Sequence, residues 1–142
     1  MAERKVADMS IPVELSALAD VIARYPFAYL LTGSAHGAPH AVAVTPLLEG
    51  GALVVDGIGR RTRQNLLARP DVGLVWPPQS MSEYSLIVDG HASMDGEAVR
   101  IAPVRAVLHR PAPRPGPVAP GGCVSDCVEL DLPATVEGAS RG

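Results

Sequence analysis

Aromatic residues are scarce in this sequence of 142 residues, which contains one Trp, one Phe and three Tyr. A folded core must therefore be built mainly from Val, Leu, Ile and Ala. The two cysteines are too few for a disulfide scaffold. Basic residues are not in excess, since 12 Lys and Arg stand against 15 Asp and Glu. This balance argues against a dedicated nucleic-acid binder.

Long apolar segments are missing as well. No run approaches the roughly 20 apolar residues that span a membrane as a helix. The first ten residues carry Glu3, Arg4, Lys5 and Asp8 where a secretory signal would have an apolar stretch. We therefore expect a cytoplasmic protein with no membrane partner.

Glycine and proline, by contrast, are abundant. The chain has 14 of each, about a fifth of its residues, against an ordinary share of roughly 12%. The hydrophobic fraction of 47% and the charged fraction of 19% are those of a folded chain, and the length suits one domain. Such frequent Gly and Pro favour many short elements joined by turns over a helical bundle.

The hydrophobic pattern predicts a mainly β domain. Residues 12–24 have apolar side chains at helical spacing, with Ser10 and Pro12 as the expected helix start, and residues 60–68 predict a second helix that ends before Pro70. Short apolar runs bounded by Gly or Pro predict six strands, at residues 27–32, 39–47, 52–56, 72–76, 84–94 and 98–108. We expect these six strands to form a small antiparallel barrel or sandwich with the two short helices, since closure protects the sheet edges.

The C-terminal part differs in composition. We place the domain at residues 1–110 and a Pro- and Gly-rich tail at residues 111–142, in which residues 127–132 could add a short strand. Cys123 and Cys127 lie in this tail and leave three alternatives open: a disulfide, half of a metal site, or two free thiols. Free thiols are favoured in a cytoplasmic protein.

The segment 56–70 is the strongest candidate for a binding site. Four of the 12 basic residues fall in ten positions, at Arg60, Arg61, Arg63 and Arg69, where a helix is predicted to start. A helix N-terminus and guanidinium groups both bind phosphate, and the Thr62 hydroxyl adds a donor. A solvated basic helix face is an equally good interpretation.

Other side chains give weaker signals. Along residues 40–45, His40, Val42 and Val44 alternate with Ala41, Ala43 and Thr45, so one face is shallow and leaves room for a flat ligand. Close packing of strands is the simpler explanation of that face. Asp89 and His91 share a strand face and suit a structural hydrogen-bonded pair. No histidine or cysteine spacing indicates a zinc enzyme, and we expect no metal site.

The order of these features resembles the FMN-binding split-barrel family related to pyridoxamine 5′-phosphate oxidase. The resemblance covers residues 12–108 and is carried by three stretches: LLTGSAHGAPHAVAV from residue 30, GRRTRQNLLARPDVGLVWPP from residue 59, and YSLIVDGHASM from residue 84. It implies a six-stranded antiparallel split barrel that forms a homodimer, with flavin mononucleotide (FMN) in a cleft at the interface. By that resemblance the phosphate lies on Arg60, Arg61 and Thr62, with Arg63 a weaker candidate. The ring would lie along Val42, Ala43, Val44 and Thr45, with Val55 and Asp56 from the next strand.

Three departures from the family pattern limit the functional prediction. Thr62 stands where the oxidases have a phosphate-binding lysine, and Asp56 stands where a neutral hydroxyl residue is frequent. The C-terminal Trp and Arg that hold pyridoxamine phosphate in the oxidases have no counterpart. We therefore predict a flavin-nucleotide-binding oxidoreductase of unknown small-molecule substrate that does not oxidise pyridoxamine phosphate. The alternatives are a reductase that uses a deazaflavin coenzyme, and a non-catalytic flavin- or haem-binding split barrel.

Overall fold

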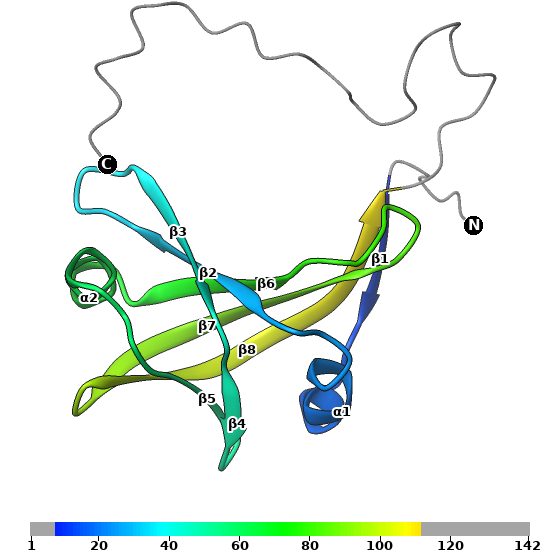
Figure 1. The fold of residues 1–142 in the computed structure, drawn as a ribbon, viewed down its shortest axis with the longest axis horizontal. Helices are drawn as coiled ribbons and strands as arrows, with labels where there is room; N and C mark the ends of the chain where they lie inside the picture. The colour runs from blue at the N-terminus through cyan, green and yellow to red at the C-terminus, as the bar shows by residue number, and fades with distance from the viewer. Residues whose placement is uncertain (1–7, 112–142) are drawn as a thin grey trace, which may run out of the picture. The chain divides into compact units, whose positions relative to one another are not determined.

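Strands make up most of the fold, which we describe for residues 8–111 of a computed structural model (Figure 1). The strands are β1 (Asp8–Pro12), β2 (Ala28–Gly33), β3 (Pro39–Val44), β4 (Leu47–Glu49), β5 (Ala52–Val55), β6 (Asp71–Trp76), β7 (Ser85–Asp95) and β8 (Ala98–Pro111). A 3-10 turn, η1 (Leu15–Ala17), leads into the short helix α1 (Leu18–Ile22), and the second helix is α2 (Arg60–Ala68). Within these residues no helix is long and apolar enough to cross a membrane.

All strand pairs are antiparallel and belong to one curled sheet. The strand order is β3-β2-β6-β7-β8-β5-β4, and β1 pairs with β8 beside this path. β3 and β4 are the two ends of the path, yet only Thr45 and Pro46 separate them in the chain. The sheet therefore has to curl until its ends meet, as the ribbon shows (Figure 1). This confirms the mainly β, antiparallel split-barrel prediction with two short helices.

An aliphatic core fills the inside of the curl, as the composition predicts. Along β2, β6 and β7, buried side chains alternate with more exposed ones, which is the pattern of a sheet with one face on the core. The largest fully buried aliphatic side chains include Leu30, Leu53, Leu74, Leu86 and Ile101. Trp76, only 1% exposed, is the one aromatic side chain among the buried hydrophobic residues of the described part.

Two boundary predictions were wrong, one near the N-terminus and one at the end of the last strand. Ser10 and Pro12 do not start a helix, because they belong to β1, which pairs with β8 from Asp8 opposite Pro111 to Pro12 opposite Val107. The same pairing extends β8 beyond the predicted end at residue 108 into the proline-rich segment. A single sequence does not reveal a partner strand so far away.

The predicted strand 39–47 is divided in the structure. It breaks at Thr45 and Pro46 into β3 and β4, so the described part has eight strands where six were predicted. Proline has no backbone N–H for the ladder, and here it lies at the corner between the two ends of the sheet. The predicted tail beyond residue 111, with Cys123, Cys127 and the short strand at 127–132, lies outside the described residues.

A close approach between β7 and β8 requires glycine at position 90. The register of this pair, the longest in the sheet, shifts between Asp89 and Gly90. A Cβ atom at Gly90 would lie 2.5 Å from the Cγ2 of Ile101 and 3.0 Å from the carbonyl oxygen of Ala102. Ordinary contacts between such atoms are about 3.5–4.0 Å, so no larger residue fits without movement.

Candidate functional site

The start of α2 carries positive charge without an acidic residue in its first turn. Gly59 precedes the helix in an extended conformation, and no side chain of the described residues caps the first turn. The first turn also lacks an acidic residue. Its backbone N–H groups therefore keep their positive field, and the exposed Arg60 and Arg61 add two guanidinium groups beside them.

The other polar residues of α2 face elsewhere. Thr62 is 1% exposed and Asn65 is 5% exposed, because residues three and four apart on a helix share its inward face. The Asn65 side-chain amide donates to the Thr32 Oγ1 at 3.0 Å, which ties α2 to β2. Arg63 is half-buried. The Thr62 hydroxyl, predicted to face the phosphate, thus lies inside the fold and apart from the exposed Arg60 and Arg61.

Arg69, the fourth arginine of the predicted cluster, has a structural contact. Its Nη2 donates to the carbonyl oxygen of Ala35 at 3.4 Å. This links the end of α2 to the β2–β3 hairpin. Of the four arginines of the segment, Arg60, Arg61 and Arg69 are exposed and Arg63 is half-buried.

The β3 strand has the predicted alternation. His40, Val42 and Val44 are half-buried, and the last two pack against the core. Ala41 and Ala43 are exposed on the opposite face. Because both side chains are small, this face of β3 is shallow.

The fold brings the end of β3 close to the start of the α2 segment. β4 pairs with β5 with Leu47 opposite Val54. Thr45, two residues before Leu47, therefore lies at the same end of this pair as Val55 and Asp56. From Asp56 the loop runs through Gly57, whose φ is +73°, to α2. Of these residues Val55 is fully buried, whereas Thr45 and Asp56 are exposed.

A hollow of about 450 Å³ lies between α2 and the β2–β3 hairpin. Arg61 and Gln64 line it from the helix, and Ser34 and His36 from the hairpin. The Ser34 hydroxyl accepts from the backbone N–H groups of His36 and Ala38, at 3.2 and 3.0 Å, and so shapes the turn. Sequence reasoning did not find this contribution of the hairpin, because the only signal in the sequence was a Gly-containing turn about 25 residues before the helix.

Large apolar side chains are exposed on the outer face of the sheet, away from the core. Tyr29 and Leu31 of β2 are 41% and 38% exposed, and Val104 of β8 is 68% exposed. A hollow of about 390 Å³ opens beside Leu31 and Val104, where Gly73 has no side chain and Gly90 also lines the space. We call Tyr29, Leu31, Ala41, Ala43 and Val104 the outer patch.

The predicted Asp89–His91 pair is not formed. His91 Nδ1 lies 3.1 Å from the Asp71 Oδ1, and Arg105 Nη1 lies 3.4 Å from the Asp89 Oδ2. Both are pairs across neighbouring strands, in register. Directly opposite residues are closer than residues two apart on one strand, which accounts for the change of partner. Residues 8–111 contain no cluster of three or more His, Cys, Asp or Glu side chains that would hold a metal.

Two mycobacterial proteins are close to this chain in sequence. They are the uncharacterized proteins Mb0449c of Mycobacterium bovis and MT0457 of Mycobacterium tuberculosis. Each is 44% identical over an alignment of 137 residues that covers 85% of this chain and 96% of the relative. No family model matches the sequence.

Solved structures with the same fold are more distant in sequence. A proposed pyridoxamine 5′-phosphate oxidase of Listeria innocua aligns with a TM-score of 0.57 at 15% identity, covering 66% of this chain and 96% of its own. An FAD-binding protein of Mesorhizobium loti aligns with a TM-score of 0.56 at 12% identity, covering 72% and 96%. The haem storage protein HutZ of Vibrio cholerae aligns with a TM-score of 0.50 at 16% identity, covering 65% and 91%. The chain therefore belongs to the family of the two mycobacterial proteins, and its fold is the split barrel of the pyridoxamine 5′-phosphate oxidase-like, flavin-binding proteins.

Proposed function

We propose that this protein is an FMN-binding oxidoreductase that works as a homodimer on a small-molecule substrate. The observation that carries the proposal is the start of α2, uncapped, free of acidic residues and flanked by the exposed Arg60 and Arg61. It lies in a fold shared with an FAD-binding protein. The buried Thr62 hydroxyl leaves the phosphate to the two guanidinium groups and the backbone N–H groups of the first helical turn.

The flavin ring would lie against the end of β3. Ala43 and Thr45 present small exposed side chains there, and Val42, Val44 and Val55 support them from the core side. Asp56 is the one acidic group of the proposed site, and its exposed carboxylate is screened by water. These residues bind and orient the cofactor, while the bound flavin supplies the hydride or electron chemistry.

A second copy of the chain would cover the outer patch. Exposed Tyr29, Leu31 and Val104 form an apolar surface that a monomer would leave in water. The hollow beside Gly73 and Gly90 offers space for a side chain of the second copy. Since Ala41 and Ala43 belong both to the outer patch and to the ring face, a dimer formed there would also exclude water from the cofactor.

Flavin titration of the purified protein tests the proposal. We expect the protein to retain yellow absorbance after incubation with FMN and desalting. Arg61→Ala should weaken FMN binding about 10- to 100-fold, since a hydrogen bond to a charged group contributes about 1.5–3 kcal/mol. Arg100→Ala is the matched control, because it removes one arginine from β8 and leaves the arginines of α2 in place.

Two results would contradict the assignment. If Arg61→Ala and Arg100→Ala bind FMN with equal affinity, the phosphate does not bind at the start of α2. A protein that stays colourless after incubation would reject FMN, and a deazaflavin coenzyme and haem would then be titrated in the same way. A ligand that raises the unfolding temperature is the one that the folded protein binds.

A further inference from the structure

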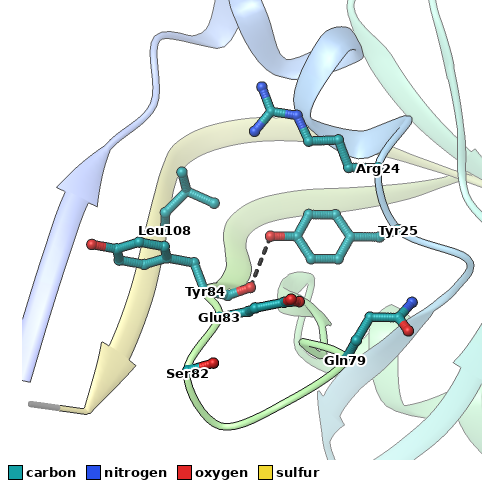
Figure 2. A pocket seen from close by; sticks show the side chains of 7 residues that line it. All are labelled: Arg24, Tyr25, Gln79, Ser82, Glu83, Tyr84 and Leu108. Carbon is teal, nitrogen blue, oxygen red and sulfur yellow. Dashed lines mark hydrogen bonds between the residues drawn. The ribbon is translucent and has the colours of Figure 1, made fainter. Parts of the chain in front are cut away.

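A second cavity, of about 300 Å³, lies away from the proposed cofactor site. It opens where the turn after α1 meets the loop between β6 and β7 and the β8 strand (Figure 2). Its walls include Arg24, Tyr25, Glu83, Tyr84 and Leu108. None of these belongs to the residues proposed for the flavin, and the volume is at the small end of ligand pockets.

The walls of this cavity are held in place by hydrogen bonds. The Tyr25 hydroxyl donates to the carbonyl oxygen of Tyr84 at 2.8 Å, the dashed line of Figure 2. Arg110 donates from Nη1 to the carbonyl oxygen of Ser82 at 2.7 Å, and its guanidinium lies 4.6 Å from the centre of the Tyr84 ring. The Glu83 N–H donates to the Ser80 carbonyl at 3.1 Å. A cavity fixed in this way binds a ligand without the entropic cost of ordering its loop.

Two opposite charges line the cavity without neutralising each other. Neither Arg24 nor Glu83 forms an ion pair with any residue in the described range 8–111. In Figure 2 the Arg24 side chain lies above the Tyr25 ring and the Glu83 side chain below it. Burial raises the pKa of Tyr25 most. Both charges also act on this phenol, since Arg24 lowers its pKa and Glu83 raises it. A cation and an anion thus both line the cavity close to the Tyr25 ring.

This arrangement is complementary to one class of small molecule. A guanidinium pairs with a carboxylate, and a carboxylate pairs with an ammonium group. The rings of Tyr25 and Tyr84 and the side chain of Leu108 suit an aromatic or apolar body that lies beside the two charged groups. We propose that this cavity binds a small aromatic zwitterion in which a carboxylate and an ammonium group are attached to one carbon beside the ring, as in an aromatic amino acid.

Binding can be measured by amide NMR shifts of the full chain with three probes. L-Phenylalanine carries both charges, 3-phenylpropanoate lacks the ammonium group, and 2-phenylethylamine lacks the carboxylate. We expect saturable shifts at residues 79–84, with L-phenylalanine bound most tightly. Arg24→Gln should weaken L-phenylalanine and 3-phenylpropanoate about three- to fivefold and leave 2-phenylethylamine unchanged, since exposed ion pairs contribute up to about 1 kcal/mol.

Charge-matched variants complete the test. Glu83→Gln should weaken L-phenylalanine and 2-phenylethylamine and leave 3-phenylpropanoate unchanged. Arg100→Gln and Glu97→Gln remove the same charges from β8 and from the turn before it, and should change none of the affinities. The proposal is overturned if no probe shifts residues 79–84 in a saturable way up to about 10 mM. It is equally overturned if Arg24→Gln and Arg100→Gln bind L-phenylalanine alike, or if the shifts fall on residues 60–63 instead.

Discussion

Gly90→Ala is the substitution whose effect follows most directly from the structure. The added methyl group would lie 2.5 Å from Ile101 Cγ2, about 1 Å inside the ordinary contact distance. Ile101 is fully buried and cannot move aside, and the next obstacle is the backbone oxygen of Ala102 at 3.0 Å. Overpacking a core costs about 1–3 kcal/mol, and we expect the upper end, because backbone must shift as well.

Urea denaturation at a fixed protein concentration measures this effect. We expect the free energy of unfolding to fall by about 3 kcal/mol and the unfolding temperature to fall by more than about 10 °C. Gly33→Ala is the control, since its methyl group would meet only the Cδ of the Arg69 side chain, at 3.6 Å. Both substitutions reduce the backbone freedom of the unfolded chain by the same amount, so this effect cancels in the comparison. A difference of less than about 1 kcal/mol between the two variants would refute the packing argument.

Three further predictions concern other parts of the molecule. Asn65→Leu should lower the free energy of unfolding, measured by urea titration, by about 1–3 kcal/mol, because the buried Thr32 hydroxyl loses its hydrogen-bond partner. Adding Thr32→Val to this variant should restore part of the lost free energy. Tyr25→Phe should make the protein lose less stability above pH 10. Burial raises the pKa of Tyr25 in the folded state, so the unfolded chain releases this proton at a lower pH and is favoured as the pH rises. An unchanged alkaline unfolding profile would contradict this. For the proposed dimer, Val104→Glu should shift the sedimentation from dimer to monomer at micromolar concentration, whereas an unchanged dimer would place the interface elsewhere.

Local patterns predicted the elements well. The helix at residues 60–68 and the alternation along residues 40–45 both appear as expected, since they depend on periods of 3.6 and 2 residues. The inward direction of Thr62 was also open to prediction, because Thr62, Asn65 and Leu66 have the i, i+3, i+4 spacing of a buried helix face. The interpretation of this segment as a phosphate-binding helix start led the prediction away from that signal.

Pairings across the sheet were not predictable from one sequence. His91 lies two residues from Asp89 but pairs with Asp71 on the neighbouring strand. The hollow between α2 and the β2–β3 hairpin depends in the same way on the docking of distant segments. Register is set by the packing of whole strands, which a residue pattern along one segment does not contain.

The pairing of β1 with β8 has a consequence for how the chain folds. Ser10 and His109 meet across this pair although 99 residues separate them, whereas β7 and β8 form a hairpin joined by a short turn. Closing a short loop costs much less entropy than closing a long one. The hairpin should therefore form early, and β1, the first strand to leave the ribosome, should be the last to join the sheet.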